Sequence, residues 1–302
     1  MGSASPSLNY KALALGTVQL GMTYGIANSS GQPSSAVAAM MVGEAWRHGV
    51  RYFDTAQDYG ASEQVLGLAL DRCGGRGEAR VISKLSVKAA LGSDLANDVA
   101  ASLQRLGVAR LWSVMMHREE ALDGDLPTRL MKVQAAGHVE HVGVSVYSPA
   151  RALQSLRMPS ITALQVAANV FDRRMKRAGV FDLAQQMGKH VFVRSVYLQG
   201  LATMSAIAAP AGIPHAAEAI AALVRFCAES GVDRRRFAMD HVRWMAPAAT
   251  LVIGAESVAQ VIENCDLLAA GPLEDTLHRE WEQRWSDDHA GLIDPRQWRL
   301  DA

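Results

Sequence analysis

The stretch VRYFD at residues 50–54 is a short run of mostly apolar, β-favouring residues that ends in a carboxylate. The same pattern recurs in RVISK at 80–84, which ends in a lysine, and in LWSVMMH at 111–117, which ends in a histidine. Short continuous runs of this kind are typical of parallel strands that are covered on both faces. The three stretches therefore predict buried parallel strands, each followed by a polar group at its carboxyl end.

Five more runs of this kind bring the number of predicted strands to eight. They are Leu13–Leu15 (ending at Gly16), His141–Val146, Ala163–Ala167, His190–Val196 and Thr250–Ile253. Segments of helical period lie between the runs, at about residues 34–48, 61–72, 93–106, 125–136, 149–156, 173–188, 216–230 and 258–268. Regular strand–helix alternation predicts a parallel sheet with right-handed crossovers. Eight units predict an α/β fold, a closed (β/α)8 TIM barrel, and the GxGxxG turn of an open dinucleotide-binding sheet is absent.

We expect one domain over residues 1–302, because no linker or shift in composition divides the chain. Two regions fit the alternation poorly. Residues 18–33 form a long, Gly-rich first loop, and residues 272–302 form a tail that contains Trp281, Trp285 and Trp298. The tryptophans predict a tail docked on the barrel, beside the site.

Composition excludes several classes of function. The 302 residues include 30 basic and 30 acidic side chains, so no net charge attracts the chain to nucleic acid or to an acidic membrane. No apolar run approaches the roughly 20 residues that span a bilayer. The first ten residues lack the order of a signal peptide, which predicts a cytoplasmic protein. Three widely spaced cysteines show no metal-ligand spacing, and we expect buried, reduced thiols and no metal site.

The ends of the strands carry the candidate chemistry. Active sites of this barrel type lie at the carboxyl ends of the strands. Successive predicted strands end with Asp54, Lys84 and His117, and Tyr59 follows five residues after the first of these. Taken singly, each residue has an ordinary structural explanation, such as an ion pair for the lysine. Four of them at matching positions predict a single site at one rim.

These residues lie in segments that resemble the aldo-keto reductase family. The segment FDTAQDYGASEQVLG at 53–67 resembles the family signature around its catalytic Asp and Tyr. VISKL at 81–85 and SVMMH at 113–117 resemble the segments that carry the family's Lys and His. LGTVQLG at 15–21 and the last four strand ends also match, so the resemblance runs from about residue 12 to 268. Its general look is closest to bacterial members linked to sugar metabolism.

The resemblance implies an oxidoreductase that moves hydride between a nicotinamide cofactor, NADP(H) or NAD(H), and a small-molecule carbonyl. Tyr59 would be the general acid. Lys84 would lower the pKa of that phenol, and Asp54 would keep Lys84 charged and in place. His117 would donate a hydrogen bond that orients the carbonyl.

The resemblance also assigns cofactor and substrate contacts. The cofactor residues would be Gly16, Thr17, Asp54, Ser145, Gln165, Arg194, Ser195, Gln199, Gly200, Gly254, Gln260, Glu263 and Asn264. Arg194 replaces a Tyr that many members stack on the nicotinamide ring. Ser257 and Gln260 also form a capping box, which is a structural reason for both. Glu256 lies near the expected 2′-phosphate and favours NADH or dual use. Tyr24, Tyr59, His117 and Arg118 would contact the substrate, with Asn28 and Trp298 in a pocket that suits a sugar-like molecule.

Two other functions remain open at this point. The chain could be a nicotinamide-binding accessory subunit with little turnover, although all four catalytic residue types are present. A lyase or isomerase using Lys84 as a Schiff-base amine is the third possibility. The substrate, the direction of reaction and the oligomeric state are not determined by the sequence.

Overall fold

The computed structural model describes residues 12–285 and 289–300. The first ten residues, in which we expect no signal peptide, lie outside the described part of the chain. The predicted domain of residues 1–302 is therefore described from residue 12 onward, and its predicted tail is described except for residues 286–288 and 301–302. No described helix has both the length and the apolar character needed to cross a membrane.

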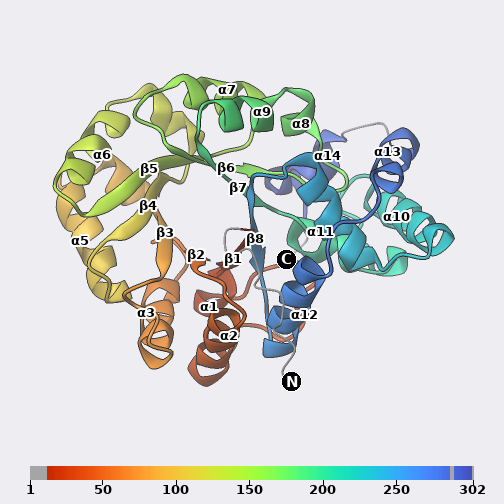
Figure 1. Ribbon diagram of the computed structural model, residues 1–302, viewed down its shortest axis with the longest axis horizontal. Coiled ribbons are helices and arrows are strands. Elements are labelled where there is room, and N and C mark those ends of the chain that lie inside the picture. Colours follow the sequence, from red (N-terminus) through yellow and green to blue (C-terminus); the bar gives the residue numbers. More distant parts are fainter. Residues whose placement is uncertain (1–11, 286–288, 301–302) are drawn as a thin grey trace, which may run out of the picture.

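Eight parallel strands close into a barrel in which each strand pairs with the next in sequence and β8 pairs with β1 (Figure 1). The strands are β1 (Leu13–Gly16), β2 (Tyr52–Asp54), β3 (Arg80–Leu85), β4 (Leu111–Met116), β5 (Val139–Val146), β6 (Ala163–Ala167), β7 (His190–Arg194) and β8 (Thr250–Gly254). The predicted single (β/α)8 barrel is confirmed, and every predicted strand is present with small shifts at its ends.

Helices surround the barrel and cover the outer faces of the strands (Figure 1). They are α1 (Val18–Gly21), α2 (Ser35–Arg47), α3 (Ser62–Arg72), α4 (Val87–Leu91), α5 (Leu95–Leu106), α6 (Leu126–Ala135), α7 (Pro149–Arg157), α8 (Arg174–Arg177), α9 (Val180–Gln186), α10 (Ala216–Ser230), α11 (Arg234–Met245), α12 (Val258–Ala269), α13 (Asp275–Arg284) and α14 (Ala290–Ile293). Short 3-10 turns are η1 (Glu119–Asp123), η2 (Leu198–Thr203), η3 (Ala206–Ala208) and η4 (Pro295–Gln297).

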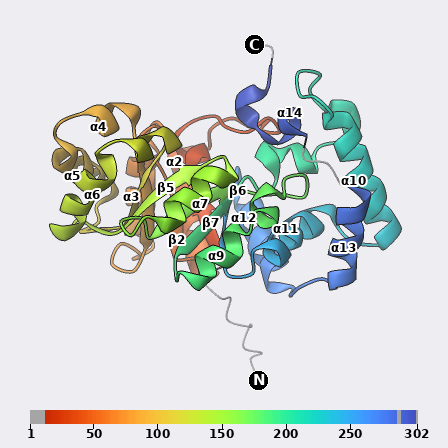
Figure 2. The ribbon, with the colours of Figure 1, turned by 90° about the horizontal axis from the view of Figure 1, so that it is seen from above.

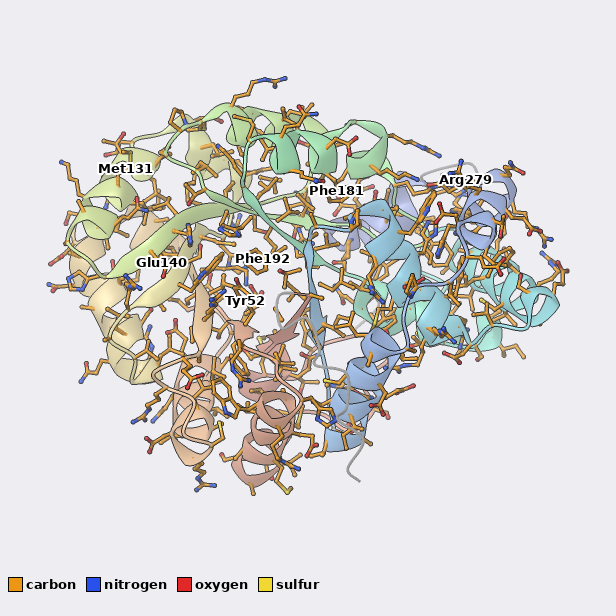
Figure 3. All side chains as sticks on the ribbon, viewed as in Figure 1. Tyr52, Met131, Glu140, Phe181, Phe192 and Arg279 are labelled. Atoms are coloured by element: carbon orange, nitrogen blue, oxygen red, sulfur yellow. The ribbon has the colours of Figure 1, made fainter. Side chains whose placement is uncertain are left out.

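Aromatic side chains fill the interior of the barrel below the carboxyl ends of its strands. Tyr52 packs edge-on against Trp112 and Phe192, with ring centroids 5.1 and 5.6 Å apart. Figure 3 shows Tyr52 and Phe192 near the middle of the barrel, whereas Met131 and Arg279 lie on its periphery. Because this layer is buried and tightly packed, the interior of the barrel is a filled core.

Two differences from the predicted helices stand out: one predicted helix is divided in two, and one helix of the structure was not predicted. The helix expected over 173–188 is divided into α8 and α9, because Gly179 adopts a left-handed conformation (φ +71°) between them. The sequence analysis placed no helix between residues 231 and 249, where α11 lies. Asp240 and His241 are both buried on that helix, so its buried face is not uniformly apolar and its helical period is obscured.

The described part of the tail packs beside α10 and α11, on the side of the barrel opposite α4, α5 and α6 (Figure 2). Trp281 of α13 is buried and donates a hydrogen bond of 2.8 Å to the backbone carbonyl of Val170, which follows β6. Its ring packs against Phe226 and Phe237. A second apolar core therefore joins α10, α11 and α13 to the barrel.

The three cysteines are free thiols, as expected. Cys227 and Cys265 are buried, but Cys73 is partly exposed because it caps the carboxyl end of α3 at the surface.

We expect Trp281→Phe to lower the free energy of unfolding by about 1–3 kcal/mol, because the carbonyl of Val170 loses its donor in a buried position. Urea denaturation measures the change. Trp298→Phe is the matched control, since Trp298 is only partly buried and donates to Leu292 within the tail itself. Equal losses of unfolding free energy in the two variants would show that the hydrogen bond to Val170 does not stabilise the packing of α13 on the barrel.

Candidate active site

A buried ion pair joins the ends of β2 and β3. Lys84 Nζ lies 2.8 Å from Asp54 Oδ1 and 2.7 Å from Asp54 Oδ2. The same ammonium donates to the carbonyl of Thr55 at 3.0 Å, so all three of its N–H bonds have acceptors. Gln165 of β6 donates to Asp54 Oδ1 at 2.8 Å. Residues from three strands are thus tied together at the barrel mouth.

Tyr59 lies directly above this pair. Lys84 Nζ is 5.1 Å from the centre of the Tyr59 ring. A tight turn places the residue, because Gly60 adopts a left-handed conformation (φ +55°) and Gly21 of α1 packs against it. A Cβ atom at position 21 would lie 1.9 Å from the carbonyl oxygen of Tyr59, so only glycine allows this approach. The first loop and the β2–α3 loop position Tyr59 together.

His117 follows β4 and faces Tyr59. The two rings meet edge-on with centroids 5.8 Å apart. Burial, together with the positive charges of Lys84 and Arg194, lowers the pKa of His117 to about 4. At neutral pH the imidazole is therefore uncharged, with one N–H that donates and one nitrogen that accepts.

The expectation that Lys84 lowers the pKa of Tyr59 needs a correction. Burial raises the pKa of Tyr59 and the carboxylate of Asp54 raises it further, while Arg194 is the cation that acts most strongly against both. Lys84 has all its hydrogen bonds on Asp54 and Thr55, and the carboxylate largely cancels its charge at the phenol. Burial also lowers the pKa of Lys84, which Asp54 opposes.

A buried network of hydroxyl groups supports the site from below, and the sequence analysis missed part of it. Thr17 Oγ1 donates to the backbone carbonyl of Asp54 at 2.9 Å. Ser62 Oγ donates to the carbonyl of Thr17 at 2.7 Å and contacts Thr55 Oγ1 at 3.0 Å. The side chain of Thr17 therefore holds β2 and α3 in place. Ser62 stands in the Asp–Tyr segment, but nothing in its spacing distinguishes it from a surface serine.

A cavity of about 770 Å³ lies next to Asp54, Tyr59 and His117. All but two of the predicted cofactor residues line it: Gly16, Thr17, Asp54, Ser145, Gln165, Arg194, Ser195, Gln199, Gly200, Gly254 and Gln260. Tyr24, Asn28, Tyr59, His117 and Glu256 line it as well. Such a volume suits a small organic ligand or a cofactor.

Five predicted residues do not line the cavity, and one of them is Lys84, which is buried with its ammonium on Asp54 and Thr55. Glu263 and Asn264 lie further along α12, where Arg235 Nε is 3.1 Å from Glu263 Oε1 and Arg235 Nη2 donates to Asn264 Oδ1 at 3.4 Å. Arg118 is exposed outside the cavity, since it stands next to His117 in extended backbone and points the other way. Trp298 donates to Leu292 within the tail and forms no part of the pocket wall.

Gln260 lies in the cavity wall, but its side-chain oxygen already accepts a hydrogen bond from the backbone. Ser257 Oγ caps α12 by accepting from the backbone N–H of Gln260. Gln260 Oε1 accepts from the backbone N–H of Glu256 at 2.8 Å, one residue before the position of the usual capping box. The structural interpretation of this pair therefore holds, and the Gln260 amide N–H groups are what face a ligand.

Two further cavity residues escaped the sequence analysis. Tyr147 follows β5, and the guanidinium carbon of Arg194 lies 4.2 Å from the centre of its ring. Arg235 comes from α11, at the end of the cavity that holds Glu256. The run RRR at 234–236 is a signal for Arg235, but its position depends on α11, which was not predicted.

Comparisons with known proteins agree with this architecture. A model of the Aldo/keto reductase family matches residues 12–285. The aldo-keto reductase AKR11C1 from Bacillus halodurans, in its holo form, has a TM-score of 0.75 at 20% identity and covers 93% of this chain and 95% of its own. The glycerol dehydrogenase AKR11B4 from Gluconobacter oxydans has a TM-score of 0.73 at 20% identity, covering 97% of each chain. No curated protein matches the chain in sequence.

The lowered pKa of His117 gives a direct prediction. The proton NMR signal that disappears in His117→Asn should titrate with a midpoint near pH 4. Because the folded-state pKa lies below the unfolded value, protonation favours the unfolded state, and wild type should lose stability relative to the variant as the pH falls from about 6.5 to about 4. A midpoint near 6.5 would mean that the ring is solvated and not buried.

Proposed function

The chain belongs to the aldo/keto reductase family and is an oxidoreductase, and we propose that it interconverts a carbonyl and an alcohol with Tyr59 as the proton donor and acceptor. The observation that carries the proposal is the convergence of four residues from loops and strands far apart in the sequence: Asp54, Tyr59 and His117 line one cavity, and Lys84 is bonded to Asp54 beside the Tyr59 ring. A bound nicotinamide would supply hydride to the carbonyl carbon or accept it from the alcohol carbon.

Tyr59 suits the role of proton donor in carbonyl reduction. Its pKa is raised, so the phenol carries its proton at neutral pH. When a carbonyl carbon accepts hydride, its oxygen becomes an alkoxide, which is a stronger base than a phenolate. The phenol therefore protonates it even with a raised pKa. In the reverse direction Tyr59 must first lose its proton to solvent, and the phenolate then takes the hydroxyl proton of the alcohol. Arg194 favours the phenolate because its positive charge opposes the rise in the pKa of Tyr59.

Lys84, Asp54 and His117 act around that proton transfer. The Asp54–Lys84 pair fixes the floor of the site and keeps a positive group 5.1 Å from the phenol ring. His117 is neutral at physiological pH, so its single N–H donates to the carbonyl oxygen and orients it without adding charge. These roles follow from positions and charges, with the tautomer of His117 set by the bound substrate.

The residues that line the cavity fit a nicotinamide dinucleotide. Ser145 and Gln165 are register partners on β5 and β6, so their side chains lie side by side at the inner end. Buried polar atoms without a partner among the described residues, Arg194 Nη2 and Gln19 Oε1, belong to residues that face the same cavity. We assign Ser145 and Gln165 to the carboxamide, and Gly200, Ser195 and Gln199 to the pyrophosphate.

The substrate is proposed to be a small hydroxylated carbonyl compound. Tyr24, Tyr59 and His117 present polar atoms to the inner cavity. The structurally similar AKR11B4 is a glycerol dehydrogenase, which supports a polyhydroxylated substrate class. Asn28 takes no direct part, because its amide bonds Tyr24 and Gly31 and thereby shapes the first loop.

Tyr59→Phe tests the function. We expect a loss of about 10²–10⁴-fold in kcat/KM for aldehydes, ketones and aldoses, because no other group donates the proton. The Kd of the reduced cofactor should change less than about twofold. Tyr52→Phe is the matched control, because Tyr52 lies in the aromatic core and does not line the cavity, so this variant should keep most activity. If wild type and Tyr59→Phe are equally inert across the panel, the protein is a cofactor-binding accessory subunit.

Cofactor preference follows from the outer end of the cavity. Glu256 lines the wall there, where a carboxylate repels a 2′-phosphate. Arg235 lies in the same wall, but it is paired with Glu263 at 3.1 Å. Arg235 also attracts Glu256, whose pKa it lowers, so a single guanidinium is shared between the two carboxylates Glu256 and Glu263. We therefore propose that NADH binds at least as tightly as NADPH.

Glu256→Gln should raise the affinity for NADPH relative to NADH by about tenfold, since it removes one charge from the site of the phosphate. Fluorescence titration with the two reduced cofactors gives the four dissociation constants. Glu140→Gln is the control, because Glu140 is exposed near the start of β5, forms an ion pair with Arg110 and does not line the cavity. A strong NADPH preference in wild type would contradict the assignment of Glu256.

A further inference from the structure

Arg194 is a charged residue of the cavity wall whose effect on a bound cofactor the proposed chemistry does not use. It is the last residue of β7, and the backbone after it turns at once into a left-handed conformation at Ser195 (φ +63°). The backbone thus changes direction directly after Arg194, whose side chain lies in the cavity wall. Its Nη2 atom is buried and has no hydrogen-bond partner among residues 12–285 and 289–300.

The positive charge of Arg194 is not matched by a carboxylate. Within the described ranges it forms no ion pair, and its two hydrogen bonds, to Ser145 Oγ and Ser195 Oγ, are long at 3.5 and 3.3 Å. The neighbouring cations are all paired. Lys84 is bonded to Asp54 and Arg235 to Glu263. Arg296, which lies 3.7 Å from the Tyr147 ring, is bonded to both oxygens of Asp294.

The guanidinium also lies close to the reacting groups. Its Nε atom contacts Ser145, which we assign to the nicotinamide carboxamide. Its charge affects the pKa of both Tyr59 and His117. A ring placed to exchange hydride with a carbonyl between those two side chains is therefore near Arg194.

We infer that Arg194 makes the site selective for the redox state of its cofactor, binding the reduced nicotinamide more tightly than the oxidised one. The inference rests on the proposed function. An oxidised nicotinamide ring carries a positive charge and a reduced ring carries none, so an unpaired cation beside the ring disfavours only the oxidised form. An aromatic side chain at this position would have the opposite effect, because its π face attracts a cationic ring.

This selectivity sets the direction that the site favours. The reaction is alcohol plus oxidised cofactor to carbonyl plus reduced cofactor plus a proton, in which the alcohol loses a hydride from carbon and a proton from oxygen. If the reduced cofactor binds more tightly by some factor, linkage requires the bound equilibrium to move toward carbonyl and reduced cofactor by the same factor. Arg194 therefore favours alcohol oxidation on the protein.

The test is the ratio of dissociation constants for oxidised and reduced cofactor, measured by calorimetry with NAD⁺ and NADH and with NADP⁺ and NADPH. Arg194→Gln should lower this ratio by about tenfold, mainly through tighter binding of the oxidised form. Arg194→Lys, which keeps the charge, should keep the wild-type ratio. Arg296→Gln is the matched control, because this second arginine on Tyr147 is already neutralised by Asp294. Both dissociation constants are measured on the same protein preparation, so an unfolded fraction affects both titrations equally and does not change their ratio.

Each other outcome overturns the inference in a distinguishable way. If Arg194→Gln weakens both forms equally, the arginine binds a part of the cofactor that is the same in both redox states. If neither constant changes, Arg194 does not contact the cofactor, although the proposed function stands. If wild type binds no nicotinamide at all, the proposed function fails together with this inference.

Discussion

The buried ion pair between Asp54 and Lys84 is the constraint on which the rest of the site depends. Taking each charge out of water costs several kcal/mol, which close attraction offsets only when the remaining hydrogen-bonding capacity is satisfied. Here the three N–H bonds of the ammonium meet two carboxylate oxygens and one backbone carbonyl. Gln165 supplies a further donor from the far side of the barrel mouth. The pair therefore demands that β2, β3 and β6 close in one register.

Satisfying that pair decides the electrostatics around it. Burial is the main reason that the phenol of Tyr59 stays protonated and the imidazole of His117 stays neutral, and the pair adds to both effects, Asp54 at the phenol and Lys84 at the imidazole. The unmatched positive charge of the inner cavity lies instead on β7, at Arg194. A sequence comparison that finds all four catalytic residue types does not reveal this arrangement, since it depends on which groups bond one another.

Most of the fold was predictable from the sequence, because strand runs and helical periods are local and repeat eight times. The positions of Asp54, Lys84 and His117 were predictable for the same reason, as all three stand where a buried run ends. The predicted residues that do not line the cavity differ from the others in direction or in partners. Arg118 follows His117 directly, and successive residues of extended backbone point to opposite sides. Glu263 matched a family position, but Arg235 from the unpredicted α11 takes its carboxylate.

Backbone strain marks the segment after β7, whose conformation neither periodicity nor resemblance predicted. Among the described residues, positive φ at non-glycine positions occurs at Ser195, Leu198, Gln199 and His215, and three of these follow β7 directly. Such conformations cost about 1–3 kcal/mol each and persist only where surrounding contacts hold them. The contacts here come from the first loop: Ile26 N–H donates to the carbonyl of Gln199 at 3.1 Å, and Ala27 packs where a side chain at Gly200 would lie. Two loops more than 150 positions apart in the sequence thus form one cavity wall. Contacts from the first loop stabilise the strained backbone of the loop after β7.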